Sequence, residues 1–269
     1  MDKGKRVLIT GASAGIGEEF ARQYAKRGWH LALTARRRDR LEGLAQALKA
    51  DHGTDCLIIP ADLAKPGAVD EIIAACNAED WAIDGLVNNA GYGLPGTFAN
   101  TSWDDQADFL QVLLTGPCEL SHKLLPGMIE RRFGRIINVA SLAGYMAGSN
   151  GHTLYGAVKA AMIKFSESLN AEAQAGGWGV NCVALCPGFT WSEFHDVNGT
   201  RAQTNQMPGW MWMDAAPVVE AGIEAAEQGV PVRVPGAANK FLASLSRVLP
   251  EPMGRGLVKR QAARFRRTE

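Results

Sequence analysis

The sequence has no excess of charge of either sign and no long apolar run. Its 28 basic and 28 acidic side chains cancel, so electrostatics gives no reason to expect a nucleic-acid partner. No apolar stretch approaches the roughly 18 residues that span a membrane. The charged first residues lead straight into a strand-like run, without a signal peptide. We therefore expect a soluble, cytoplasmic protein without an integral membrane segment.

Cysteine is also scarce, and its spacing excludes the common metal motifs. The five cysteines form no CxxC pair. Neither they nor isolated histidines such as His152 and His195 have the spacing of metal ligands. Because most of the cysteines lie in apolar stretches, we expect buried thiols in a reducing compartment rather than disulfides. We predict no metal site.

Apolar, β-branched runs alternate with amphipathic helical patterns through most of the chain. Such alternation is typical of a parallel sheet covered by helices on both faces. The predicted strands are 6–10, 30–34, 56–60, 85–89, 134–140, 180–186 and 230–234, and the predicted helices lie near 16–28, 38–50, 66–78, 102–131, 153–176 and 214–228. The sequence therefore predicts an α/β fold, a Rossmann-like, doubly wound parallel sheet of about seven strands with helices on both faces.

The chain divides into one large domain and a short tail. We expect residues 1–235 to form the domain, with a substrate segment at 189–215. Residues 236–269 are rich in arginine and lysine and are expected to form a basic helical C-terminal extension, with helices at 237–247 and 252–267. Packing of this extension on the domain or on a neighbouring subunit is favoured over a membrane-surface or partner helix.

A glycine-rich stretch, TGASAGIG at residues 10–17, follows the first strand and opens the first helix. In this glycine loop Gly11, Gly15 and Gly17 let the backbone approach a pyrophosphate at the positive end of the helix. The same letters match the GxSxG nucleophile elbow around Ser13, and a purely structural turn is a third interpretation. Only about ten residues precede Ser13 and no triad partners follow at a suitable spacing, so dinucleotide binding is favoured.

The second predicted strand ends at TARRR, residues 34–38. Dinucleotide folds that bind NAD usually carry an acidic residue here, which accepts a hydrogen bond from the ribose 2′-hydroxyl. This chain has Arg36 and Arg37 instead, and a guanidinium group suits the 2′-phosphate of NADP. A solvated basic helix start would explain the arginines equally simply, but the glycine loop upstream favours NADP.

Tyr155 and Lys159 stand four residues apart in YGAVK, so a helix would present both on one face. A nearby ammonium group lowers the pKa of a phenol, which makes tyrosine an acid/base usable near neutral pH. Ser141 ends the predicted strand 134–140, at the sheet edge where ligands bind in this kind of fold. Its hydroxyl could hold a carbonyl oxygen.

Six motifs in register give the sequence a resemblance to the short-chain dehydrogenase/reductase family over residues 5 to about 235. The motifs are TGASAGIG, ADL (61–63), NNAG (88–91), Ser141, YGAVK (155–159) and CPGFT (186–190). The resemblance implies an NADP(H)-dependent oxidoreductase that interconverts a carbonyl and a secondary alcohol. It also implies a homodimer or homotetramer formed through the helices at 102–131 and 153–176.

The resemblance also implies residue roles. Tyr155 is expected to be the acid/base, Lys159 to bind the nicotinamide ribose and lower the tyrosine pKa, and Ser141 to orient the substrate carbonyl or hydroxyl. Together with the arginines, the motifs give the predicted cofactor site: Gly11, Ser13, Gly15, Ile16, Gly17, Arg36, Arg37, Asp62, Leu63, Asn89, Ala90, Gly91, Tyr155, Lys159, Pro187, Gly188 and Thr190.

One position departs from the family pattern. The family usually has an asparagine three residues before a glycine in the central helix, where it bends the helix and holds a water linked to the lysine. Aligned on Gly116, that position is Leu113. Leucine is expected to do neither. Water could reach Lys159 by another route, which we favour, or the chain could be a catalytically weak NADP-binding protein.

The segment after the last motif carries more large apolar side chains than an ordinary surface loop. They are Phe189, Trp191, Phe194, Met207, Trp210, Met211, Trp212 and Met213, and Tyr145 and Met146 are expected on the opposite wall. One interpretation is a cover over a pocket for a small apolar carbonyl or alcohol substrate. Packing on the domain body or on a dimer mate is an equally open alternative.

Overall fold

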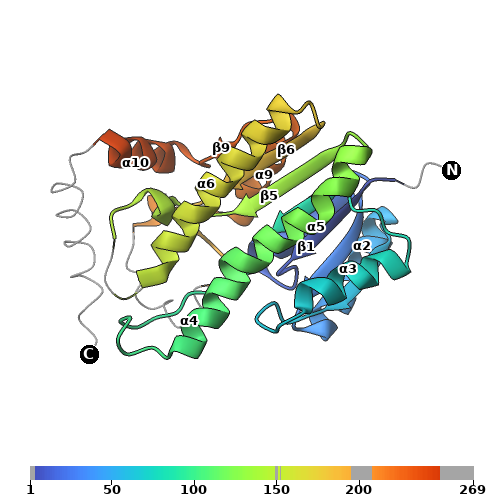
Figure 1. The fold of residues 1–269 in the computed structure, drawn as a ribbon, viewed down its shortest axis with the longest axis horizontal. Coiled ribbons are helices and arrows are strands. Elements are labelled where there is room, and N and C mark those ends of the chain that lie inside the picture. The colour runs from blue at the N-terminus through green and yellow to red at the C-terminus, as the bar shows by residue number, and fades with distance from the viewer. Residues whose placement is uncertain (1–3, 149–150, 152, 195–207, 249–269) are drawn as a thin grey trace.

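The computed structural model describes residues 4–148, 151, 153–194 and 208–248, and its centre is a sheet of seven parallel strands (Figure 1). The strands are β1 (Arg6–Thr10), β2 (His30–Ala35), β3 (Cys56–Pro60), β4 (Gly85–Asn88), β5 (Gly134–Val139), β6 (Val180–Leu185) and β9 (Val232–Arg233). They lie in the order β3-β2-β1-β4-β5-β6-β9, with every neighbouring pair parallel. The predicted doubly wound α/β fold is confirmed.

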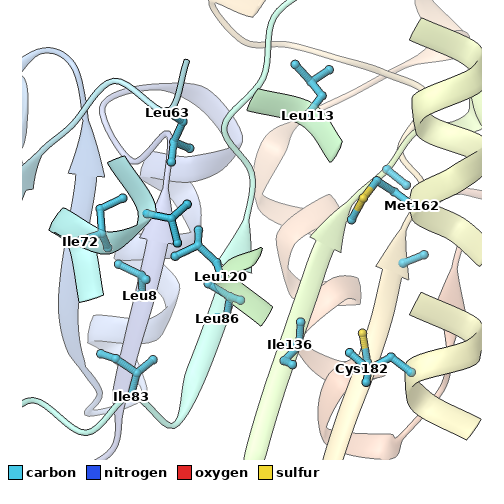
Figure 2. Packing of buried hydrophobic residues seen from close by; sticks show 14 of the residues in the cluster. Leu8, Leu63, Ile72, Ile83, Leu86, Leu113, Leu120, Ile136, Met162 and Cys182 are labelled. Carbon is cyan, nitrogen blue, oxygen red and sulfur yellow. The ribbon is translucent and has the colours of Figure 1, made fainter. Parts of the chain in front are cut away.

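Helices cover both faces of this sheet, because successive side chains of a strand point to opposite sides. In β1, Leu8 belongs to one core cluster, whereas Val7 and Ile9 belong to the other. The first cluster packs beneath α3 (Ala68–Ala78), α4 (Trp103–Leu110), α5 (Gly116–Glu130) and α6 (Thr153–Ala175), and Figure 2 shows part of it. The second packs beneath α1 (Gly15–Lys26), α2 (Arg38–His52) and α9 (Ala215–Gln228).

The predicted helix at 102–131 is interrupted in the structure. Between α4 and α5 the chain forms a π-turn, η1 (Gln111–Thr115), in which the N–H of Gly116 donates to the carbonyl of Gln111. Pro117 has no N–H, so the carbonyl four residues earlier, that of Leu113, has no α-helical donor. The interruption lies beside this proline, and the expectation that Leu113 does not itself bend the helix stays a prediction.

Shorter elements surround the carboxyl ends of the strands. Residues Leu142–Tyr145 form the 3₁₀ turn η2, and Gly209–Met211 form η3. Within the expected substrate segment, β7 (Phe189–Thr190) and β8 (Trp212–Met213) make a small parallel sheet that the sequence did not predict. The helix expected at 237–247 is present as α10 (Ala237–Val248) and packs against η2. The one expected at 252–267 lies outside the described residues.

Two expectations about absent features can be compared with the described residues. All five cysteines lie within the described residues and none of them is joined in a disulfide; three are buried and two are partly buried. Within the described ranges, none of the helices combines the length and the apolar character that crossing a membrane requires.

Candidate functional site

The predicted site residues gather where the carboxyl ends of the central strands meet. Gly11 follows β1, Asn89 follows β4, Ser141 lies just beyond β5 and Pro187 just beyond β6. The sheet order reverses between β1 and β4, because the chain builds outward to β3 before it returns to β4. In open α/β sheets such a reversal creates the crevice that binds ligands. Four motifs that are distant in sequence therefore share one sheet edge.

The glycine loop is fixed by hydrogen bonds from the turn after β4. The side-chain amide of Asn89 donates to the carbonyls of Thr10 and Gly11, at 3.0 and 3.2 Å. The hydroxyl oxygen of Thr10 accepts from the backbone N–H groups of Asn89 and Ala90, at 2.9 and 3.0 Å. A Cβ on Gly17 would clash with the Gly11 carbonyl oxygen. The absence of a side chain at Gly17 thus makes room for the Gly11 carbonyl of the loop rather than for a ligand.

The glycine loop also presents the N-terminus of α1. Gly15, Ile16 and Gly17 begin a helix of 12 residues, and first-turn N–H groups have no carbonyl one turn before them. These donors, together with the helix dipole, fit a pyrophosphate. Gly15 adopts a left-handed φ of 57°, and a Cβ there would come within 2.8 Å of the Cβ of Ser192. The segment after β7 therefore lies against this loop.

The two predicted arginines differ in their surroundings. Arg36 is exposed. Arg37 donates from Nη2 to the hydroxyl oxygen of Ser13 and to the carboxylate of Glu193, each at 3.1 Å. The other carboxylate oxygen of Glu193 accepts from Arg40 at 3.0 Å. These hydrogen bonds, Arg37 first, lower the pKa of Glu193, so this carboxylate is ionised. Arg40 and Glu193 were not predicted as site residues.

Asp62 and Leu63, the predicted cofactor residues of the ADL motif, occupy different environments. Asp62 is partly buried and accepts a hydrogen bond from the N–H of Ala64 at 3.2 Å. Leu63 is only 7% exposed, and its side chain belongs to the core cluster of Figure 2. Gly91 is exposed and lies beside Leu113, whose Cγ would be 3.5 Å from a Cβ on Gly91. Leu113 therefore backs the NNAG turn.

The three predicted catalytic residues are brought together. Lys159 lies with its Nζ 5.7 Å from the centre of the Tyr155 ring and donates to the carbonyl of Val139 at 2.7 Å. Ser141 begins η2, where its hydroxyl oxygen accepts from the N–H of Ala143 at 3.1 Å. The Ser141 side chain lies close enough to the Tyr155 phenol to act on its pKa in the downward direction. The end of β5 and the start of α6 thus assemble a serine, a tyrosine and a lysine.

Burial governs the electrostatics of this group. It lowers the pKa of Lys159, which is 8% exposed, to about 8. Burial also raises the pKa of Tyr155, and the Ser141 side chain only partly offsets that rise. Lys159 was expected to lower the tyrosine pKa; that effect of Lys159 stays a prediction, because burial is the largest cause of the net shift.

The turn after β6 contacts both η2, which follows Ser141, and α10 of the C-terminal extension. The carbonyl of Pro187 accepts from the N–H of Leu142 at 2.9 Å. Thr190 is buried and donates to the Gly188 carbonyl at 3.3 Å. Asn239 of α10, which is 5% exposed, abuts Gly188 and leaves no room for a Cβ there. Sequence patterns gave no signal for this contribution from the extension.

We call Phe189–Phe194 together with Trp212–Met213 the aromatic segment. Trp191 stacks on Trp212 with ring centres 3.9 Å apart, and Phe189 packs on the same ring at 5.4 Å. The Phe194 ring lies 6.2 Å from that of Tyr155. Trp212 is buried, whereas Trp191 is 47% exposed. Part of the predicted apolar cover thus packs on itself, and part reaches Tyr155. Met207 and the histidines 152 and 195 lie outside the described residues.

The described residues contain no group of three or more histidine, cysteine, aspartate or glutamate side chains that could hold a metal ion. The described part of the site offers hydroxyl groups, a lysine and anion-binding donors. Hydroxyl, phenol and ammonium groups at the sheet edge suit proton transfer at an oxygen atom. The α1 terminus and the arginines suit phosphate groups.

Comparisons of sequence identify related proteins. The family model for the short chain dehydrogenases matches residues 5–202. Nodulation protein G from Rhizobium sp. (strain N33) is 40% identical over 193 residues, which cover 72% of this chain and 76% of that protein. Ketoacyl reductase HetN from Nostoc sp. (strain PCC 7120) is 37% identical over 206 residues, covering 77% of this chain and 70% of that protein.

Comparisons of structure agree with those of sequence. A short-chain dehydrogenase from Sphingobium yanoikuyae, solved in complex with NADPH, is 29% identical with a TM-score of 0.80, and 95% of each chain is covered. The bulky-bulky ketone specific alcohol dehydrogenase from Comamonas testosteroni is 28% identical with a TM-score of 0.74, covering 98% of this chain and 96% of that one.

Proposed function

Because the chain belongs to the short-chain dehydrogenase/reductase family of oxidoreductases, we propose that it interconverts a carbonyl group and a secondary alcohol on an apolar substrate, with NADP(H) as cofactor. A bound nicotinamide supplies or accepts the hydride. The observation that carries the proposal is the group formed by Tyr155, the Ser141 side chain near its phenol, and the buried Lys159 beside its ring. It lies at the sheet edge where the glycine loop also ends.

Tyr155 is the acid/base in this proposal. Its raised pKa keeps the phenol protonated near neutral pH, which is the state that can donate a proton to a carbonyl oxygen. Ser141 already accepts from Ala143, so its own hydroxyl proton is available to the same substrate oxygen as charge develops there. Oxidation runs the same proton transfer in reverse, and Tyr155 must lose its proton before it can accept one from the alcohol.

Lys159 is proposed to position and polarise rather than to react. Its hydrogen bond to Val139 fixes the ammonium group near the Tyr155 ring. With a pKa of about 8, the amine is charged at pH 7 and becomes neutral at higher pH. A positive charge beside the phenol stabilises the phenolate that remains after proton donation. Activity in the reductive direction is then expected to fall as the pH rises through 8.

The residues at the other end of the site fit a phosphorylated dinucleotide. The first N–H groups of α1 suit the pyrophosphate. Ser13, Arg36 and Arg37 provide a hydroxyl and two guanidinium groups for a 2′-phosphate. The NADPH bound in the Sphingobium yanoikuyae relative supports this cofactor choice.

Replacing Arg36 and Arg37 together by alanine tests the cofactor choice. The Kd for NADPH is expected to rise roughly 10- to 100-fold, the loss of two charge-assisted contacts, whereas the Kd for NADH changes little. Arg38→Ala is the matched control, because Arg38 pairs with Glu42 at 3.5 Å and not with Ser13. An equal loss of NADPH and NADH affinity would rule out recognition of the 2′-phosphate.

The catalytic claim is tested by NADPH consumption with a panel of apolar ketones and aldehydes. The aromatic segment, and the ketone-specific relative from Comamonas testosteroni, motivate the choice of panel. Tyr155→Phe is expected to lower kcat/KM about 100- to 10,000-fold. Tyr24→Phe, which removes a hydroxyl from the core beneath α1, is expected to leave it unchanged. Tight NADPH binding with no turnover that Tyr155→Phe abolishes would favour a catalytically weak binding protein, in keeping with Leu113.

Three broader assignments accompany this function. We infer that residues 1–235 act as one catalytic domain, that residues 236–269 form an extension of it, and that the protein works in the cytoplasm. Assembly into a homodimer or homotetramer through the helices at 102–131 and 153–176 rests on analogy with the family. Light scattering coupled to size-exclusion chromatography measures the assembly; a mass near 28.8 kDa, that of a single chain, would contradict it.

A further inference from the structure

Glu193 holds the same arginine that is proposed to bind the cofactor phosphate. Its two carboxylate oxygens accept from Arg37 at 3.1 Å and from Arg40 at 3.0 Å. Arg40 belongs to the first turn of α2, and the backbone N–H groups of that turn add positive potential. Two guanidinium groups beside a helix N-terminus make a site that suits a phosphate as well as the carboxylate that occupies it here.

The Nη2 atom of Arg37 is already committed. This nitrogen carries two protons. One of them points to the hydroxyl oxygen of Ser13 and the other to Glu193, each at 3.1 Å. A 2′-phosphate that recruits this nitrogen must displace one of these two partners, and repulsion between like charges makes the Glu193 carboxylate the partner that gives way. NADH has no 2′-phosphate, so its binding does not require Glu193 to be displaced.

We propose that Glu193 is an internal anion that competes with the 2′-phosphate for Arg37 and thereby sets the preference between NADPH and NADH. This inference rests on the proposed function, because it assumes that Arg37 meets a cofactor phosphate. A phosphate dianion outcompetes a single carboxylate at paired guanidinium groups, so NADPH still binds. Its affinity is reduced by the free energy needed to break the Glu193 pairs, whereas NADH affinity is not.

The neighbours of Glu193 show why its release matters. Ser192 lies against Gly15 of the glycine loop, and the Phe194 ring lies 6.2 Å from Tyr155. Three consecutive residues thus touch the phosphate loop, the arginine pair and the catalytic tyrosine. When a 2′-phosphate displaces Glu193 from Arg37, it therefore frees the residue that links Ser192, which contacts the glycine loop, to Phe194, which lies beside Tyr155.

The experiment compares ligands that differ in the 2′-phosphate. Calorimetry gives the Kd of adenosine 2′,5′-bisphosphate and of NADPH, and, as counterparts without that phosphate, of ADP and NADH. In Glu193→Gln the Kd for the two 2′-phosphate ligands is expected to fall about two- to fivefold, the range for a partly exposed ion pair. The Kd for ADP and NADH is expected to stay the same. Glu193→Asp, whose shorter side chain cannot reach both arginines, is expected to give a smaller change in the same direction.

Glu42→Gln is the matched control. Its carboxylate pairs with Arg38, one residue from Arg37, at 3.5 Å, so it removes the same charge from the same helix start. If Glu42→Gln and Glu193→Gln lowered the Kd of the 2′-phosphate ligands equally, the proposal would be overturned. The loss of one negative charge near the start of α2 would then explain the change in both variants. Weaker binding of the 2′-phosphate ligands in Glu193→Gln would also overturn it, since Glu193 would then hold the arginines for the ligand.

These results separate the inference from the proposed function. If the wild type prefers NADPH and the double alanine variant of Arg36 and Arg37 loses that preference, the cofactor assignment stands. An unchanged selectivity in Glu193→Gln then overturns the role of Glu193 alone. If the wild type does not distinguish adenosine 2′,5′-bisphosphate from ADP, the NADP assignment fails and the competition fails with it.

Discussion

The glycine loop and the aromatic segment meet at one edge of the sheet, but different interactions hold them. Hydrogen bonds between Asn89, Thr10 and the loop backbone fix the glycine loop. Among the described residues, the aromatic segment has only the short β7–β8 pairing as a backbone connection, and otherwise depends on ring stacking around Trp212 and on the ion pairs of Glu193. Backbone hydrogen bonds set positions to within tenths of an ångström, whereas exposed rings and ion pairs tolerate rearrangement.

This difference suits the two tasks proposed for the site. A phosphate-binding loop needs backbone donors in fixed directions. A segment that covers a substrate must change its contacts when a ligand enters. Substitutions in the glycine loop and in the turn after β4 that supports it are therefore expected to cost more stability than substitutions in the aromatic segment. Four variants test that ranking.

Leu113→Asn is expected to have the largest effect. Leu113 is 2% exposed, belongs to the core cluster and backs the NNAG turn beside Gly91. Burying an amide there loses apolar burial and adds an unpaired polar group, at a cost of about 3 kcal/mol in urea unfolding. Turnover by the folded protein is expected to stay within about twofold, since Ser141, Tyr155 and Lys159 are in place. The partly buried neighbour Leu114→Asn should cost less.

Leu113→Asn also tests whether the absence of the asparagine that is usual in the family limits turnover. A clear rise in turnover would show that a missing asparagine limits the rate. Unchanged turnover would agree with a helix interruption that Pro117 already provides. Stopped-flow measurement of NADPH oxidation, normalised to the folded fraction, distinguishes the two results.

Gly17→Ala comes next. In an ordinary helix, replacing glycine by alanine stabilises by about 1 kcal/mol. Here the added Cβ would clash with the Gly11 carbonyl oxygen and with the Asn89 amide. We expect a loss of about 2 kcal/mol and a large loss of NADPH affinity, because the loop must move. Gly43→Ala is the control, since nothing lies within 4 Å of its Cβ position in α2, and it should stabilise instead.

Lys159→Met is expected to stabilise the fold while abolishing activity. Burial lowers the lysine pKa from 10.5 to about 8. Between these values the unfolded chain binds more protons than the folded one, so wild-type stability gains from rising pH there. Below pH 8 the full cost of burying the charge is present. The variant should therefore gain about 2 kcal/mol at pH 7, and the gain should shrink towards pH 10.

Urea unfolding at the two pH values measures this prediction. Lys164→Met on the same helix is the control, because Lys164 has a side chain 79% exposed and pairs only with Glu167 in a surface ion pair. A gain for Lys159→Met that is the same at pH 7 and pH 10 would contradict a buried charge as its cause.

Much of the fold, and the position of the glycine loop, could be predicted from the sequence. Strand ends fell within a few residues of prediction because apolar runs and glycine turns mark them, as in the loop at Gly11. The pair Glu193 and Arg37 could not be predicted, because the partners lie 156 positions apart and neither stands in a periodic pattern. The direction of the Tyr155 pKa shift was also hidden, since burial depends on the packed structure rather than on spacing.

Trp191→Ala is expected to have the smallest effect on stability and so to complete the ranking. Trp191 stacks on Trp212 at 3.9 Å, but its ring is 47% exposed, so the pair should contribute about 1 kcal/mol or less. The backbone hydrogen bond from Trp191 to Met213, at 3.0 Å, survives the change. If the ring covers an apolar substrate, KM for ketones should rise while kcat holds. Trp103→Ala removes a ring that is 66% exposed on α4 and serves as the control. A stability loss larger than that of Gly17→Ala would reverse the ranking and make the aromatic segment the more rigid of the two regions.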